Sequence, residues 1–189
     1  MILAIDVDYQ DEEKTAQIAG VVFSTWQSTV VEQIYQKKLN KIEPYEAGAL
    51  YKRELPCILS LLEDIQQDLS CIVVDGYVFL GQEDHAGLGL HLWQALDQKI
   101  PVIGVAKNYF RGTPISCEIL RGNSQKPLYI TAVGMPLDAA KHAISTMAGQ
   151  HRVPTLLKLV DQKSRAAFNS NIACEKRTKK TKLTLYFLM

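Results

Sequence analysis

The chain has 189 residues, enough for one domain with a substantial core, and 47% hydrophobic against 22% charged residues is ordinary for a folded domain. Polar residues interrupt every apolar run, so the composition argues against a transmembrane helix, and the first residues lack the features of a signal peptide. We therefore expect a cytoplasmic protein without a membrane partner. The cysteines have neither CxxC nor zinc-ligand spacing, which favours free thiols at Cys57, Cys71, Cys117 and Cys174.

The net charge of +1 hides an uneven distribution. Residues 170–189 contain five of the 21 basic residues and one of the 20 acidic ones, which leaves 16 basic against 19 acidic residues in 1–169. A slightly acidic body gives no electrostatic footprint for nucleic acid, so charge alone argues weakly against a nuclease. We expect one domain over residues 1–169 and a mobile basic tail over 170–189, which could steer a polyanion.

The first forty residues predict three strands. Residues 1–9 alternate with period 2, with Leu3 and Ile5 on one face and Ala4 and Asp6 on the other. Residues 15–26 and 29–38 are rich in Val, Ile, Phe and Thr and are split by a polar pair at 27–28. Short polar connections between three strands predict an antiparallel meander.

The rest of the chain alternates between helical and strand patterns. Residues 47–67 have a helical period, in which Pro56 must start a helix or kink one. After it we expect strands at 71–74 and 101–106, a strand pair at 117–120 and 128–133, and helices at 85–98, 137–147 and 154–167. A meander leading into βαβ units predicts an α/β fold, in which a mixed sheet of antiparallel and parallel strands is flanked by helices.

Three carboxylates occupy positions that the apolar pattern predicts to be buried, where an unpaired charge would cost free energy. Asp6 lies inside an apolar strand, Asp75 ends another, and Glu54 falls on the apolar stripe of its helix if that helix continues through Pro56. Buried carboxylates usually pair, become neutral or bind a metal, and oxygen ligands suit Mg²⁺ or Mn²⁺. Lys107 ends the neighbouring buried strand and could hold a phosphate or the attacking water.

Each of these residues, taken alone, also fits an ordinary structural role. Asp75-Gly76 is a common turn pair, Glu54 could pair with Lys52 or Arg53, and a lysine after a strand is usually exposed. Their joint placement favours a catalytic site over these separate structural roles, but only modestly.

Several segments resemble motifs of the endonuclease V family and occur in the order of that family. They cover most of residues 1–165, and the last of them is the most specific: Ala4-Ile-Asp-Val-Asp-Tyr9, Pro44-Tyr-Glu-Ala-Gly48, Tyr51-Lys-Arg-Glu-Leu-Pro56, Val74-Asp-Gly76 and Pro101-Val-Ile-Gly-Val-Ala-Lys107.

The resemblance implies a ribonuclease H-like fold and Mg²⁺-dependent cleavage, with Mn²⁺ as a possible substitute. The cleaved phosphodiester lies on the 3′ side of deoxyinosine in DNA or inosine in RNA, so nucleic acid is the implied partner. Carried over by position, Asp6, Glu54 and Asp75 become metal ligands, with Lys107 as the partner of the phosphate or the water. Asp161 matches a late acidic or histidine position near the metal, although an exposed helix aspartate fits it as well.

The resemblance also implies a set of substrate-binding residues. Tyr45 matches a wedge that fills the gap left by an extruded base, which an aromatic ring can do by stacking. Arg53, Gly76, Gly104 and His91 are expected to contact the substrate. A tyrosine packed over a loop and a histidine packed on a helix are the bland alternatives for Tyr45 and His91.

The chain also departs from the family pattern. The second proline of the wedge is Ala47, and one extra residue after Leu80 puts His85 out of register with a family motif. This altered 77–86 loop keeps open a serious alternative, a divergent nucleic-acid-binding protein that does not cleave. A receiver domain would need a helix after the first strand, and an actin-like phosphotransferase would need glycines between Met1 and Ala19, where none occurs.

Overall fold

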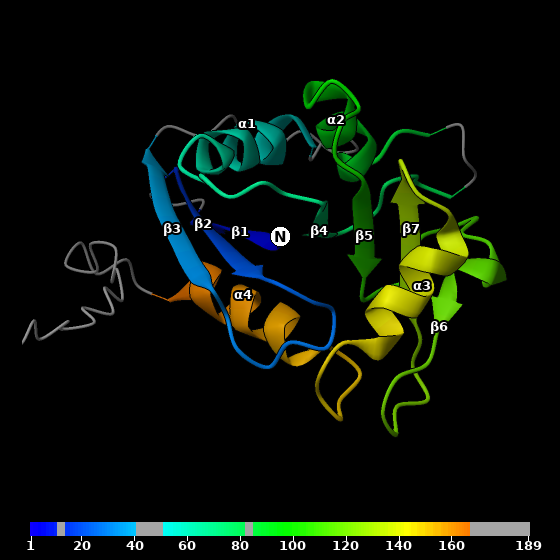
Figure 1. The fold of residues 1–189 in the computed structure, drawn as a ribbon. Coiled ribbons are helices and arrows are strands. Elements are labelled where there is room, and N and C mark those ends of the chain that lie inside the picture. Colours follow the sequence, from blue (N-terminus) through cyan, green and yellow to red (C-terminus); the bar gives the residue numbers. More distant parts are fainter. Residues whose placement is uncertain (11–13, 41–50, 82–84, 167–189) are drawn as a thin grey trace, which may run out of the picture.

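The computed structural model describes residues 1–10, 14–40, 51–81 and 85–166, which build a seven-stranded mixed sheet with helices on both faces (Figure 1). The strand order is β3-β2-β1-β4-β5-β7-β6. Tyr45, Ala47, part of the 77–86 loop, Cys174 and the expected basic tail lie outside the described residues.

The expected meander is confirmed. Strand β1 (Ile2–Gln10) pairs antiparallel with β2 (Thr15–Phe23), which pairs antiparallel with β3 (Gln33–Asn40). The second and third strands are shorter than predicted, because a turn occupies residues 24–32. In that turn the Ser28 hydroxyl accepts a hydrogen bond from the Thr25 backbone N–H at 3.1 Å, and such local bonds compete with the strand ladder.

The parallel part of the sheet brings the ends of β4 (Cys71–Asp75) and β5 (Val102–Ala106) to one edge, beside the middle of β1. These two strands extend the sheet from β1 in parallel, with Ile5 opposite Val74 and Val74 opposite Gly104. Strand β7 (Leu128–Val133) then pairs antiparallel with β5, and β6 (Glu118–Ile119) pairs antiparallel with β7, after the short 3₁₀ helix η1 (Ile115–Cys117). In open α/β sheets, ligands bind outside the carboxyl ends of such parallel strands.

Helices cover the two faces of the sheet as expected (Figure 1). Helices α1 (Tyr51–Leu62) and α2 (Leu88–Ala95) lie on one face, and α3 (Leu137–Thr146) and α4 (Thr155–Arg165) lie on the other. The alternation predicted for the first strand divides the core accordingly. Leu3 and Ile5 pack with the α1 and α2 side, whereas Ile2 and Ala4 pack with the α3 and α4 side.

Helix α1 continues through Pro56, which removes one backbone hydrogen bond without ending the helix. Glu54 therefore lies on the same helix as the fully buried Ile58 and Leu61, as its spacing predicted. Helix α2 begins at Leu88, three residues later than predicted, because the His85 carbonyl accepts the Leu80 N–H at 2.8 Å and closes a loop first.

Two further expectations concern the described part of the chain. None of its helices combines the length and apolar character that crossing a bilayer requires. Cys57, Cys71 and Cys117 are buried and form no disulfide with one another, which agrees with the prediction.

Candidate active site

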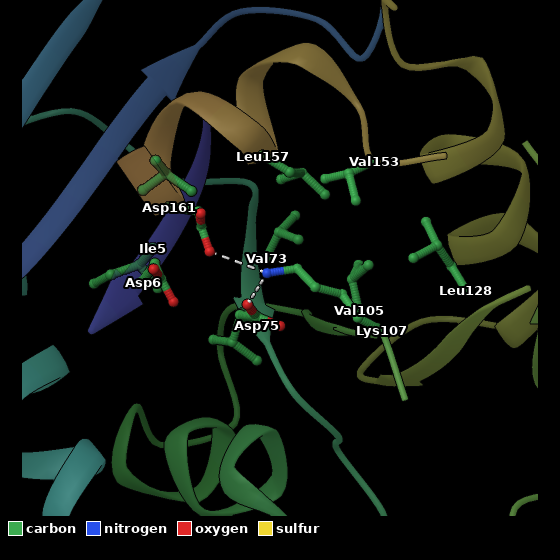
Figure 2. A pocket seen from close by; sticks show the side chains of 12 residues that line it. Ile5, Asp6, Val73, Asp75, Val105, Lys107, Leu128, Val153, Leu157 and Asp161 are labelled. Carbon is green, nitrogen blue, oxygen red and sulfur yellow. Dashed lines mark hydrogen bonds and ion pairs between the residues drawn. The ribbon is translucent and has the colours of Figure 1, made fainter. Parts of the chain in front are cut away.

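An acidic pocket opens where β4 and β5 end, beside the middle of β1 and the helix α4. Figure 2 shows Asp6, Asp75, Asp161 and Lys107 around one space. The cavity between them is about 20 Å³, which is room for one water molecule or one ion. Its walls are apolar: Ile5, Val73, Val74, Val105, Leu128, Val153, Leu157 and Val160.

Lys107 is the cationic centre of this pocket. Its Nζ donates to Asp75 Oδ2 at 2.6 Å and to Asp161 Oδ1 at 3.1 Å, so it joins the end of β4 to α4 (Figure 2). Burial favours the neutral amine, but hydrogen bonds and attraction to the two carboxylates outweigh burial and raise the pKa of Lys107. Lys107 therefore stays charged, and Asp161 faces the pocket instead of lying exposed on its helix.

Asp6 projects from β1 towards the same space. Burial, together with the charges of Asp75 and Asp161, raises its pKa from 3.8 to about 6. The Ser164 hydroxyl donates to Asp6 Oδ2 at 2.6 Å and opposes this shift, since it stabilises the ionised form. Asp6 thus has a neutral hydrogen-bond donor but no ion-pair partner among the described residues.

Glu54 approaches the cluster from α1. Burial first, and then the charges of Asp6 and Asp75, raise its pKa from 4.5 to about 8, while the charge of Arg53 acts in the opposite direction. None of the described residues donates a hydrogen bond to Glu54. It is the most strongly destabilised anion of the cluster.

The four carboxylates share an electrostatic environment without forming a finished metal site. As the side chains lie, no three Asp, Glu, His or Cys residues in the described part of the chain are close enough to hold one ion. Lys107 pairs with Asp75 and Asp161, and Arg165 Nη2 also pairs with Asp161 Oδ1 at 3.1 Å, whereas Asp6 and Glu54 keep raised pKa values. Arg53 offsets the raised pKa of Glu54 only in part, and Asp6 forms no ion pair with any described residue.

Two glycines shape the backbone beside Asp75. Gly76 has φ of +143°, a conformation that residues with a side chain rarely adopt. A Cβ on Gly104 would stand 2.6 Å from the Gly76 carbonyl oxygen and 2.8 Å from the Val78 amide nitrogen. The absence of a side chain at Gly104 lets the chain after Asp75 cross directly over β5.

The loop after Lys107 is fixed by Tyr77. The Tyr77 hydroxyl donates to the Asn108 carbonyl at 2.8 Å and accepts the Phe110 N–H at 3.1 Å. Farther along this loop, the Tyr109 hydroxyl accepts the Gly112 N–H at 3.1 Å. Backbone on both sides of the pocket is thus held in defined positions.

The remaining candidates for substrate binding, Arg53 and His91, lie on α1 and α2. Arg53 is buried, with its guanidinium 4.1 Å from the centre of the Tyr9 ring. His91 stacks on the Tyr51 ring with centroids 3.7 Å apart, and burial lowers its pKa. The pocket therefore brings together Asp6, Asp75, Asp161 and Lys107, whereas Glu54 lies outside its lining and interacts with Asp6 and Asp75 only through charge. Arg53 and His91 are engaged in contacts between elements.

Sequence reasoning missed two residues that touch this site. Ser164 follows Asp161 by three positions on α4, so helical spacing could have placed it on the same face. Arg152 Nη2 donates to the main-chain carbonyls of Lys107 and, at 2.6 Å, of Pro127. No sequence pattern indicates that Arg152 makes these two contacts.

Comparisons with known proteins agree with this fold. The family model described as Endonuclease V matches residues 1–137. An Endonuclease V of Streptomyces coelicolor is 28% identical over 189 aligned positions, which cover 88% of this chain and 78% of that protein.

Solved structures are similar as well. The Endonuclease V of Streptomyces avermitilis matches with a TM-score of 0.68 and 25% identity, over 87% of this chain and 79% of that one. The Endonuclease V of Ciona intestinalis, in complex with a 24mer DNA containing an inosine followed by a ribo-adenosine, matches with a TM-score of 0.73 and 18% identity, over 87% and 83%. These likenesses confirm the ribonuclease H-like fold expected from the sequence.

Proposed function

The chain belongs to the endonuclease V family and is an endonuclease, and we propose that it hydrolyses a phosphodiester bond on the 3′ side of deoxyinosine in DNA or inosine in RNA. Its proposed cofactor is Mg²⁺, with Mn²⁺ as a substitute. The observation that carries the proposal is the Lys107 bridge between Asp75 and Asp161, beside Asp6 and Glu54. The inosine-containing DNA bound to the Ciona protein supports the choice of base.

The donor set fits a hard divalent cation. Asp6, Glu54, Asp75 and Asp161 offer only carboxylate oxygens, which Mg²⁺ and Mn²⁺ prefer. Burial raises the pKa values of Asp6 and Glu54, so a bound cation would favour their ionised forms, and the cavity beside Asp6, Asp75 and Asp161 has the size of one ion. The side chains would have to move for three of these groups to share an ion, because no three of them are close enough as the structure has them. A bound divalent ion would supply charge stabilisation for the phosphodiester and a more acidic water.

Lys107 has a separate role in the proposed reaction. Its ammonium stays protonated and projects into the pocket, where it can donate to a phosphate oxygen or to the attacking water. Water attacks phosphorus in line with the leaving 3′-oxygen, which yields a 3′-hydroxyl and a 5′-phosphate. Lys107 thus stabilises charge at the phosphate and orients the nucleophile.

Base recognition is assigned to backbone groups next to the phosphate site. The chain after Asp75, from Gly76 to Gly81, crosses over β5 at Gly104 and faces the loop that contains Gly112, since a Cβ on Gly81 would contact residues 111 and 112. Backbone amides and carbonyls held in this way can read the edge of an extruded base. The proposed wedge, Tyr45, rests on its sequence motif alone.

The proposal is tested by cleavage of oligonucleotides that differ only in carrying inosine or adenosine, as DNA and as RNA, with Mg²⁺ or with a chelator. We expect Mg²⁺-dependent cutting of the inosine strands, and a loss of at least about 100-fold in Asp75→Asn, since a charge-stabilising group is removed. The matched control is Asp97→Asn, the same chemical change at an exposed turn after α2.

Two results would contradict the proposal. Equal cutting of inosine and adenosine strands would remove the base specificity. Tight binding of inosine strands without any Mg²⁺-dependent product would favour a protein that binds without cleaving.

A further inference from the structure

Arg152 holds the backbone of Lys107. Its guanidinium donates through Nη2 to the Lys107 carbonyl and to the Pro127 carbonyl, the latter at 2.6 Å. We propose that Arg152 is a positioning residue of the nuclease reaction, which aims the Lys107 ammonium by fixing the main chain that carries it. The inference rests on the role proposed above for Lys107.

Lys107 needs such support because the sheet stops just before it. The last residue of β5 that pairs with β7 is Ala106, opposite Tyr129. Beyond that pair the carbonyl of Lys107 has left the strand ladder, and a lysine side chain has a flexible stem of four carbons. The carboxylates restrain the Lys107 ammonium, Arg152 holds the carbonyl of the same residue, and Tyr77 holds the carbonyl of the next residue, Asn108. When a phosphate competes for the ammonium, the restraint by Arg152 remains.

Arg152 is itself held by a second arginine. Arg121 is buried and donates through Nη1 to the carbonyls of His151, at 2.9 Å, and Arg152, at 3.4 Å. Its other nitrogens donate to the carbonyls of residues 145, 147 and 149. The backbone of the segment between α3 and α4 is thus held in place, and so is the main chain from which the Arg152 side chain extends.

The position of Arg152 also links the two elements that the Lys107–Asp161 ion pair joins, β5 and α4. Two residues after it, Pro154 precedes α4, the helix that carries Asp161. Arg152 therefore ties the start of α4 to the end of β5, and the Lys107–Asp161 ion pair spans the same two elements. Loss of this tie would let the lysine and the carboxylate separate, and a misplacement of about 1 Å in an active site can cost about 100-fold in rate.

The test compares Arg152→Ala and Arg152→Lys with the wild type, with kcat and KM measured on an inosine-containing strand. We expect kcat to fall about 10- to 100-fold in Arg152→Ala while KM changes less than about threefold, since the phosphate contact of Lys107 matters most in the transition state. Arg152→Lys should recover part of kcat, because an ammonium can still donate to one carbonyl. Ile144→Ala, a change at a fully buried site in α3, serves as a control for lost stability and should leave kcat near the wild-type value.

A double-mutant cycle with Lys107→Ala separates positioning from folding. If Arg152 acts through Lys107, Arg152→Ala lowers the rate by less than about threefold in the Lys107→Ala background. The same fold-loss in both backgrounds, or a loss matched by Ile144→Ala at equal stability, would overturn the inference while leaving the proposed role of Lys107 intact. A Lys107→Ala variant with the wild-type rate would overturn that role and the inference with it.

Discussion

Replacing Glu54 with Gln should stabilise the metal-free protein at alkaline pH. Burial, followed by the charges of Asp6 and Asp75, raises the pKa of Glu54 from 4.5 to about 8 in the folded protein. Between these values the folded chain keeps a proton that the unfolded chain releases. The resulting stabilisation is complete below pH 4.5 and is lost as the pH rises through about 8.

The size of this effect follows from the two pKa values. Each pH unit between them corresponds to about 1.4 kcal/mol, so the ionised Glu54 lowers the free energy of unfolding by at most about 5 kcal/mol. Glutamine keeps the shape of the side chain and cannot ionise. Glu54→Gln should therefore lie within about 1 kcal/mol of the wild type at pH 5 and exceed it by up to about 5 kcal/mol at pH 9.

Urea unfolding at pH 5, 7 and 9, in the presence of a chelator, measures this difference. Glu63→Gln provides the matched control, because Glu63 is exposed just after α1, and it should change stability by less than about 0.5 kcal/mol at any pH. Parallel pH profiles for the wild type and Glu54→Gln would refute the reasoning, since they would mean that Glu54 ionises in the folded chain without cost.

Two further predictions concern the support of the site. Ser164→Ala removes the hydrogen bond that stabilises ionised Asp6, so the pKa of Asp6 should rise further. The acid limb of the pH–rate profile should therefore move to higher pH. An acid limb at the wild-type position would contradict this role of Ser164. Gly104→Ala places a methyl group against the backbone of Gly76 and Val78, which should lower the unfolding free energy by about 1–3 kcal/mol in a urea titration and reduce cleavage. Wild-type stability and activity in Gly104→Ala would show that the chain after Asp75 can cross β5 with a methyl group present at residue 104.

The sequence predicted the sheet because its information there is local. The alternation of Leu3 and Ile5 with Ala4 and Asp6 matches the division of the core between the two helical layers. Element boundaries were less accurate where a side chain bonds to nearby backbone, as Ser28 does in the turn after β2.

The acidic cluster was predictable for a topological reason. Asp75 stands at the end of β4 and Lys107 directly after β5, and Asp6 lies in β1 one residue beyond its parallel pairing with β4, so the three meet at one edge of the parallel part of the sheet. Asp161 needed the family motif, because a helix aspartate carries no such constraint.

The supporting contacts depend on tertiary packing and left little local signal. The hydrogen bond from Arg152 to the Lys107 carbonyl joins segments 45 residues apart. Its acceptor is a backbone carbonyl, which every residue type has, so the sequence does not indicate the bond. The stacking of His91 on Tyr51 likewise depends on how α1 and α2 meet.

The most direct test of the central claim is Mn²⁺ or Mg²⁺ binding at pH 8, measured by titration calorimetry with and without a non-cleavable inosine-containing strand. We predict saturable binding in the wild type, loss of that binding in Asp6→Asn and Glu54→Gln, and its retention in Asp97→Asn. Wild-type protein that binds neither ion even with the strand present, or equal binding by all four proteins, would contradict a cation site formed by these carboxylates.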